Sequence, residues 1–197
     1  MIEPRKVLLT LVVIGATGAL VAASAFSAFS ATTQNSGNSF AAGTVNISDN
    51  DAAAAMYSVT NQKPGVTLER CIKVTYNGTL DSDVRLYTAS SLGSLAPYVN
   101  LTITPGTQAV SVFPDCTGFT ADGAALFNGT LSGFAASHST YATGLADYPG
   151  TLATKWVAND AVVYRFELSL QDNNAANGGS SALTTGAHAF TWESRNQ

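Results

Sequence analysis

The sequence predicts an all-β protein, a single jelly-roll-type β-sandwich with an N-terminal extension. Short segments in which apolar and polar residues alternate recur along the chain. Gly, Pro, Asn and Asp separate these segments and are the residues that turns favour. No segment carries a convincing amphipathic helical pattern. About eight short strands without helices are typical of a sandwich, and of a jelly roll in particular.

The extension begins with the layout of a secretory signal peptide over residues 1–27. Arg5 and Lys6 form the positive start, an apolar run follows, and small residues close the segment. These small residues predict cleavage between Ser27 and Ala28, with cleavage before Ala31 as the alternative. The apolar run is nearly long enough for a membrane anchor, but no stop-transfer charge cluster follows it. We therefore expect secretion, with membrane contact only during export.

The rest of the chain divides into two parts. Residues 28–39 are expected to form a flexible N-terminal arm, and residues 40–197 are expected to form the β-sandwich domain. A domain of this length can bury a sizeable hydrophobic core. The arm is polar and compatible with a strand, which suits pairing with another chain.

The first half of the domain contains the clearest strand pattern. Residues 40–47 alternate weakly and predict the first strand, and an acidic turn is expected at 48–51. Residues 52–56 are compatible with a short helical turn. After a Pro-Gly turn, residues 66–76 alternate strictly and predict a half-buried strand. An Asn-Gly turn then leads into a strand expected at 83–90.

The second half is less regular. Residues 119–134 carry apolar residues at helical spacing, but Gly129 and Gly133 interrupt them, so irregular short strands and turns are expected. Residues 135–150 are expected to form a loop of small residues, and 171–179 a loop rich in Asn and Gly. The other expected strands are residues 98–105, 110–113, 152–157, 160–170 and 186–194.

Cys71 and Cys116 are the only cysteines, and in an exported protein they predict one disulfide. Such a bridge closes a loop of about 45 residues and stabilises the fold by roughly 3–4 kcal/mol in the chain-entropy model. The alternation places Cys71 on the polar row of its strand, together with Glu69 and Lys73. We therefore expect the disulfide to pin a loop to the outer face of the sheet.

The composition argues against a nucleic-acid partner. Charged residues make up only 11% of the chain, against about 25% in an ordinary soluble domain. The net charge is −4, and Lys and Arg are not clustered. Binding to phosphates needs clustered cations that release counterions. The surface is expected to be neutral and rich in hydroxyl groups.

Catalytic machinery is not evident in the sequence. The two histidines, His138 and His188, are not part of an HExxH, GxSxG or CxxC pattern. His138 is expected to be exposed in a loop. His188 shares a row with Phe190 and Trp192 and is expected at a strand end, in the core or at its rim. We expect no catalytic, cofactor-binding or metal-binding residues, and no cofactor.

The acidic pairs also favour an ordinary structural role. Asp49 and Asp51 could hold Ca²⁺, but the Gly and distal Glu of an EF-hand loop are missing. Turn chemistry is the favoured interpretation for this pair and for Asp81 and Asp83. The strand aromatics are expected to fill the core. A monomeric surface-binding module would need an exposed aromatic platform, which we do not find.

The chain has four Asn-x-Ser/Thr triplets, which are candidate acceptors of N-linked glycans. A chain this rich in Asn, Ser and Thr supplies about as many triplets by chance. The four asparagines are Asn46, Asn77, Asn100 and Asn128.

Two blocks flank the leader junction, Ala28-Phe29-Ser30 and residues 38–47, which read NSFAAGTVNI. They resemble the leader junction of the TasA/camelysin family, whose members are cut by a SipW-type signal peptidase. The Pro64-Gly65 turn, the strand after it and the Asn77-Gly78-Thr79-Leu80 turn look like the family pattern more loosely. The closing residues 190–197 are similar to the terminal strand of the family.

The resemblance implies a jelly-roll domain and a fibre-forming subunit of an extracellular biofilm matrix or a pilus-like surface filament. In such assemblies the arm of one subunit completes a sheet of the next by donor-strand complementation, which gives a head-to-tail homopolymer. Camelysin-like relatives are described as zinc-dependent endopeptidases, so a secreted metalloendopeptidase is the alternative. The expected donor residues, of which only Phe29 is a large anchor, are Ala28, Phe29, Ser30, Ala31, Thr32, Thr33, Gln34 and Asn35.

Overall fold

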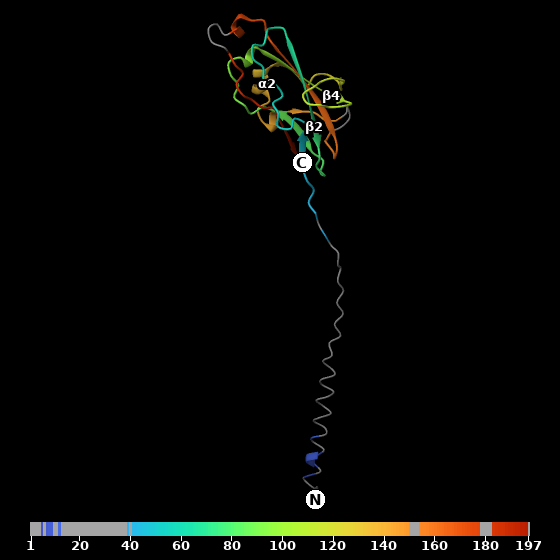
Figure 1. Ribbon diagram of the computed structural model, residues 1–197. Helices are drawn as coiled ribbons and strands as arrows, with labels where there is room; N and C mark the ends of the chain where they lie inside the picture. Colours follow the sequence, from blue (N-terminus) through green and yellow to red (C-terminus); the bar gives the residue numbers. More distant parts are fainter. Residues whose placement is uncertain are drawn as a thin grey trace. The chain divides into compact units, whose positions relative to one another are not determined.

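The computed structural model describes residues 41–149, 154–177 and 183–196, together with residues 5, 7–9, 12 and 39. The chain divides into two compact units, Met1–Ala41 and Ala42–Gln197 (Figure 1). The expected cleavage site at Ser27 and Ala28 and the expected donor residues 28–35 lie outside the described residues. In the part of the chain that is described, no helix has the length and apolar character needed to cross a membrane.

The second unit is built from two antiparallel sheets, and the all-β sandwich that the sequence predicts is confirmed. The larger sheet has the order β1 (Ile47–Asp49), β2 (Thr67–Tyr76), β8 (Ala161–Leu170), β4 (Val99–Gln108) and β5 (Phe119–Ala121), with β6 (Phe127–Thr130) also paired to β4. The smaller sheet has the order β7 (Leu145–Ala146), β3 (Asp83–Tyr87) and β9 (Thr191–Arg195). The helical segments are η1 (Ala96–Tyr98), α2 (Leu131–Ser137), η2 (Tyr141–Thr143) and η3 (Asn174–Asn177).

The hydrophobic core lies between the two sheets. The large sheet contributes alternate residues of its three long strands, as the sequence alternation predicts. The small sheet contributes Val84 and Leu86. Phe190 packs on Phe166 with ring centroids 4.7 Å apart, and Trp192 lies 5.5 Å from Tyr164. Each fully buried large side chain stabilises the fold by roughly 1.5–3 kcal/mol, so the core aromatics join the sheets strongly.

The first strand differs from the prediction. The expected strand at 40–47 is wrong in position, because β1 occupies Ile47–Asp49, where an acidic turn was expected. The preceding residues are nonetheless bonded to the turn after β2. The Thr44 carbonyl accepts from the amides of Thr79 and Leu80, at 2.9 and 3.2 Å, and the Asn46 carbonyl accepts from the amide of Asn77 at 2.8 Å.

The expected helical turn at 52–56 is also wrong. Ala52 and Ala53 have positive φ angles of 52° and 63°, outside the right-handed helical region. The Asp51 carboxylate accepts from the amide of Ala53 at 2.6 Å, a local bond that favours a turn instead of a helix.

Two other expected strands fail for different reasons. Residues 110–113 form no strand but belong to a loop held by the disulfide. Within 152–157, the structure describes residues 154–157, and only Trp156 makes a β-bridge, with Ser82. The strands expected at 66–76, 83–90, 98–105, 160–170 and 186–194 correspond to β2, β3, β4, β8 and β9, with shifted ends.

The segment 119–134 is more regular than expected. It contains β5, β6 and the start of α2. The helix begins after Thr130, whose hydroxyl accepts from the amide of Gly133 at 3.0 Å and so caps the first turn. Leu131 and Phe134 bury the inner face of the helix. The loop expected at 135–150 likewise contains the end of α2, η2 and β7.

Candidate assembly surface

At one side of the sandwich, β1 of the large sheet and β9 of the small sheet approach each other, and a groove of about 250 Å³ lies between them. Its walls are mixed, with four apolar side chains, two hydroxyl groups and one carboxylate. They include Ile47, Asp49 and Val74 on one side and Phe190, Thr191 and Trp192 on the other.

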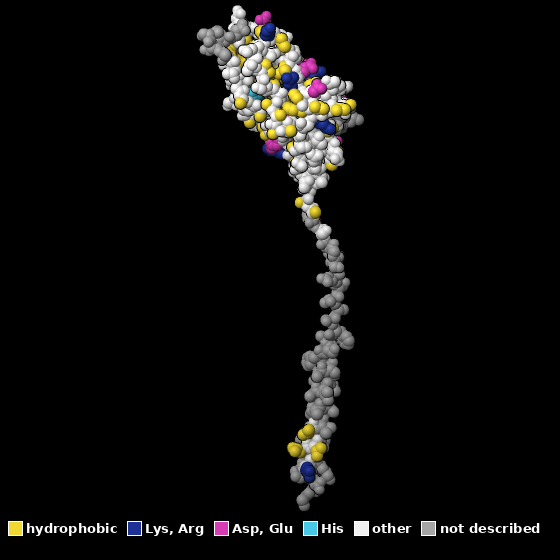
Figure 2. All heavy atoms as spheres, viewed as in Figure 1, with side chains coloured by type: hydrophobic (Ala, Val, Ile, Leu, Met, Phe, Trp, Pro, Cys, Tyr) yellow, Lys and Arg dark blue, Asp and Glu magenta, His cyan; other side chains and the backbone are white. Residues whose placement is uncertain are grey.

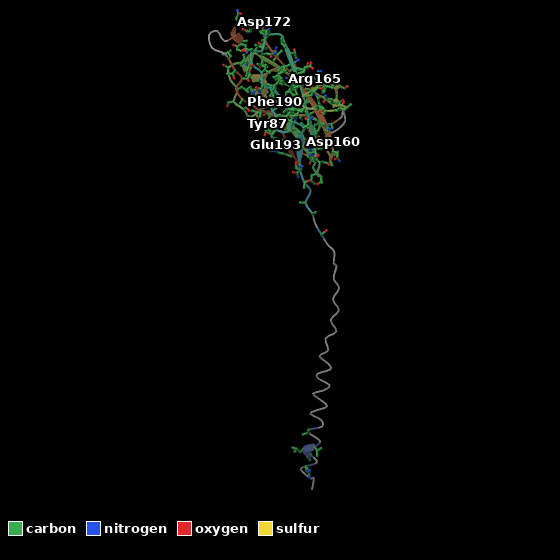
Figure 3. All side chains as sticks on the ribbon, viewed as in Figure 1. Tyr87, Asp160, Arg165, Asp172, Phe190 and Glu193 are labelled. Atoms are coloured by element: carbon green, nitrogen blue, oxygen red, sulfur yellow. A yellow bond between two sulfur atoms is a disulfide. The ribbon has the colours of Figure 1, made fainter. Side chains whose placement is uncertain are left out.

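The β9 strand forms one edge of the small sheet. In the described part of the chain it pairs with β3 alone. On the outer face, the Tyr87 hydroxyl of β3 donates to Glu193 of β9 at 2.8 Å, and Arg195 pairs with Glu193 within β9 at 2.6 Å (Figure 3). Among the described residues, the second edge of β9 has no strand beside it, an arrangement that can accept another strand.

His188 lies at the entry to β9, half-buried at the rim of the core as the sequence predicts. Its Nε2 is 2.5 Å from the Tyr57 hydroxyl oxygen, and its Nδ1 is 2.9 Å from the Gly186 carbonyl oxygen. Burial raises the pKa of Tyr57. Both ring nitrogens of His188 thus have structural partners.

The outer edge of β2 is closed, in contrast to β9. At Lys73 the amide donates to the Asn50 side chain at 2.8 Å, and at Cys71 the amide donates to the Pro114 carbonyl at 3.0 Å. At Glu69 the carbonyl accepts from the guanidinium of Arg70 at 2.7 Å. Side chains and a loop thus occupy backbone groups that an added strand would need.

The predicted disulfide between Cys71 and Cys116 is present, with Cα atoms 5.1 Å apart. Cys71 lies on the outer row of β2, as the alternation predicts, yet only 1% of it is exposed. Val163 and Thr104, on the same face of the large sheet, are buried as well. The sequence alternation did not predict this burial on the outer face.

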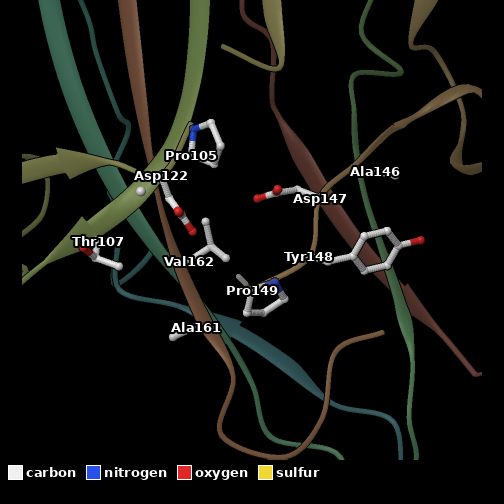
Figure 4. A pocket seen from close by; sticks show the side chains of 10 residues that line it. Pro105, Thr107, Asp122, Ala146, Asp147, Tyr148, Pro149, Ala161 and Val162 are labelled. Atoms are coloured by element: carbon white, nitrogen blue, oxygen red, sulfur yellow. The ribbon is translucent and has the colours of Figure 1, made fainter. Parts of the chain in front are cut away.

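A second cavity, of about 470 Å³, lies beside β4 and β8 of the large sheet and β7 of the small sheet, and contains two carboxylates. Asp122 and Asp147 both point into it (Figure 4). One oxygen of Asp147 is buried without a hydrogen-bond partner among the described residues, and burial raises the pKa of Asp147 to about 6. The indole of Trp156 donates to the Asp147 carbonyl at 2.6 Å and fixes the backbone there.

The structure also shows the surroundings of His138, Asp49 and Asp51. His138 is half-buried, so its expected exposure is wrong; its ring lies 5.1 Å from that of Phe134, and its Nδ1 is 2.6 Å from the Thr143 carbonyl oxygen. The turn role of Asp49 and Asp51 is confirmed, because the Asp51 amide donates to the Asp49 carboxylate at 3.1 Å.

The turn interpretation of Asp83 is wrong. Asp83 begins β3 and is 5% exposed, and its carboxylate accepts from Lys155 at 2.8 Å and from the Tyr148 hydroxyl at 2.9 Å. Burial alone would raise the pKa of Asp83, but these hydrogen bonds outweigh it and hold the pKa below its usual value. Asp83 therefore tethers the segment around Tyr148 to the small sheet.

All four candidate glycan acceptors are exposed, and two of them are hydrogen-bonded on the surface. Asn77 donates to the Ser48 hydroxyl at 2.8 Å, and Asn100 accepts from Gln171 at 2.8 Å. In the described part of the chain, no three His, Cys, Asp or Glu side chains gather as metal ligands would. The exposed asparagines are Asn46, Asn77, Asn100 and Asn128.

Comparison with known families finds a match to the first half of the chain. Residues 5–95 match the family described as camelysin metallo-endopeptidase. The matched region runs from residue 5 through β3 and includes the wall of the groove at β1. A search of curated proteins finds no match.

Proposed function

We propose that this chain, which residues 5–95 place in the TasA/camelysin family, is a secreted structural subunit. Its copies polymerise head to tail. Proteins of this family are generally extracellular or surface-associated. The polymer is an extracellular fibre of a biofilm matrix or a pilus-like filament of the cell surface. Its subunits are joined by donor-strand complementation, and the protein is not an enzyme.

The observation that carries this proposal is the edge of β9, which in the described part of the chain pairs with β3 alone and lies beside the groove. An edge strand with free backbone groups gains hydrogen bonds when another strand is added. Ile47, Val74, Phe190 and Trp192 form the apolar part of the groove, so apolar side chains on one face of the added strand become buried against them. The chain itself carries a strand-compatible arm at 28–39.

The neutral surface supports the same proposal. Figure 2 shows a face on which Lys, Arg, Asp and Glu are sparse among apolar and uncharged polar groups. Charged residues make up 11% of the whole sequence. Copies of such a protein repel one another only weakly, so close packing in a polymer has a small electrostatic cost.

Deletion of residues 28–39 from the secreted chain tests the proposal. We expect a folded domain by circular dichroism and no filaments by electron microscopy. A matched control replaces the same residues with a Gly/Ser linker of equal length, which keeps the spacing but removes Phe29 and the strand propensity. It is also expected to form no filaments. Filaments that form as before from the deleted chain would rule out donor-strand complementation by this arm.

A second candidate function is a secreted metalloendopeptidase, favoured by the description of the matched family. Its test is release of dye from azocasein by the purified chain. Activity that disappears with a chelator, and with His138→Ala or His188→Ala, would support the protease. Absence of release under all metal conditions would support the structural subunit.

A further inference from the structure

We propose that the arm of a second copy of this chain pairs with β9, along the backbone groups of Trp192 and Ser194, and that its Phe29 enters the groove between β9 and β1. This inference rests on the proposed function and deepens it by naming the acceptor. The partner is a second copy of the chain, and the segment that it supplies is residues 28–35.

The direction of the backbone groups on β9 follows from the hydrogen bonds of β3. Ser82 exchanges two backbone bonds with Trp156, at 3.0 and 2.8 Å, and the Thr88 amide donates to the His138 carbonyl at 2.9 Å. Alternate residues of a strand bond to opposite neighbours. The backbone amide and carbonyl groups of the even-numbered residues therefore point away from β9. Those of the odd-numbered residues from Asp83 to Tyr87 bond to β9.

The register then identifies the free groups of β9. Asp83 is paired with Arg195, Arg85 with Glu193, and Tyr87 with Thr191. These three residues of β9 are therefore the ones that bond to β3. By alternation, the amide and carbonyl groups of Trp192 and Ser194 point to the open edge, beside the groove.

The edges at β2, β7 and β1 are less suitable acceptors. The outer edge of β2 is occupied at Lys73, Cys71 and Glu69 by the bonds described above. β7 has two residues and β1 has three, and β1 ends in the turn formed by Asp49. β9 has five residues, and the groove behind it contains Phe190 and Trp192, so it gives an added strand both a longer edge and aromatic side chains to pack on.

The arm fits the chemistry of this groove. Residues 28–35 carry no charge. In a strand, Phe29, Ala31 and Thr33 share one face. Phe29 is the only large side chain of that face, and the groove offers Phe190 and Trp192 as aromatic neighbours.

The test uses the full secreted chain with Ser194→Pro, which removes the outward amide of β9. Proline is tolerated on an edge strand whose amide does not bond within the sheet. We expect the concentration needed for filament formation to rise about tenfold or more, because a backbone bond is lost and its partner carbonyl is left unpaired. The matched control Ser194→Ala loses the same hydroxyl, which contacts Ser82, but keeps the amide. It should assemble normally.

A proline on the other edge completes the comparison. Glu69→Pro removes an outward amide from β2, and we expect filaments to form as in the unmodified chain. Assembly that survives Ser194→Pro but fails with Glu69→Pro would overturn the assignment to β9. If the arm deletion abolishes filaments while both proline variants assemble, the inference fails and the proposed function stands.

Crosslinking gives a measurement that does not depend on how well Ser194→Pro folds. A photoreactive phenylalanine in place of Phe29 should crosslink to the neighbouring copy in filaments, at residues 47–49 or 190–194 by mass spectrometry. Crosslinks to residues 67–71 would overturn the proposal. Crosslinks within one monomer would assign the groove to the chain's own arm and would overturn it as well.

Discussion

Asp147 is the residue whose charge works against the fold. Its pKa is about 6, raised from 3.8 by burial. As the pH rises from about 4 to about 6, the unfolded chain releases this proton before the folded chain does, so the folded state is penalised and remains so at higher pH. Asp147→Asn should therefore raise the free energy of unfolding at pH 7–8 by about 1–2 kcal/mol, after allowance for partial exposure.

Urea unfolding of both proteins between about pH 2.5 and pH 8 checks this prediction. The difference should vanish below about pH 3, where the carboxyl group is protonated in both the folded and the unfolded state. Asp122→Asn, which changes the facing carboxylate at an exposed position, is the control and should change stability by less than about 0.5 kcal/mol. Equal stabilisation by Asp147→Asn at both ends of the pH range would show that the effect is not due to its charge.

At the scale of elements, α2 depends on its cap. The helix has seven residues and contains Gly133, so its intrinsic stability is low. Thr130→Ala removes the hydroxyl that accepts from the amide of Gly133 and should lower the free energy of unfolding by about 1 kcal/mol. Thr130→Ser keeps both the cap and the glycan triplet of Asn128, and should be nearly neutral in urea unfolding. Equal losses in the two variants would mean that packing of the Thr130 methyl group matters instead.

The disulfide also acts on whole elements, because it fixes a loop to the strand β2. Replacing Cys71 and Cys116 together with Ser should lower the free energy of unfolding by roughly 3–4 kcal/mol and leave a folded core. Thermal melting and near-ultraviolet circular dichroism measure the two effects separately. Treatment of the unmodified chain with a reductant should lower its melting temperature similarly. A chain that does not fold without the bridge would show that the outer layer around Val163 is essential to the core.

The elements also show what the sequence could and could not predict. β2 and β8 were predictable because alternation over ten residues is a local pattern that burial on one face imposes. α2 was missed because two glycines mask a helix that a cap and buried packing stabilise. The ion pair of Asp83 and Lys155 joins residues far apart in the sequence. No periodicity encodes that contact.

The candidate acceptor strand, β9, could not be predicted from the sequence either. Alternation identified the inward row of β9, including Trp192, but not which strand would lie beside it. That depends on the side chain of Asn50 and the carbonyl of Pro114, which close the edge of β2 and leave β9 open. The donor residues 28–35 and the cleavage site remain predictions, since they lie outside the described residues.

At the scale of the whole molecule, the low charge predicts how assembly responds to salt. The arm has no charge between residues 28 and 35, and among the residues that the structure describes, Asp49 is the only ionisable one that lines the groove. Dissolved salt therefore has few charge interactions to screen between the arm and the groove. The concentration needed for filament formation should change less than about twofold between about 0.02 M and about 0.5 M NaCl, by light scattering. A steep salt dependence would indicate that charged surfaces outside the groove join the subunits.

The bonds of Thr44 and Asn46 also determine how a filament bears mechanical force. Tension transmitted along the arm would enter the domain at Thr44, whose carbonyl holds two amides, and pass through β1 into β2 and β8 at the centre of the large sheet. Several hydrogen bonds share that force inside each subunit, whereas a junction relies on one short added strand. Stretched filaments should therefore rupture between subunits before any domain unfolds, a sequence of events that single-molecule force spectroscopy would record as breaks without preceding extension.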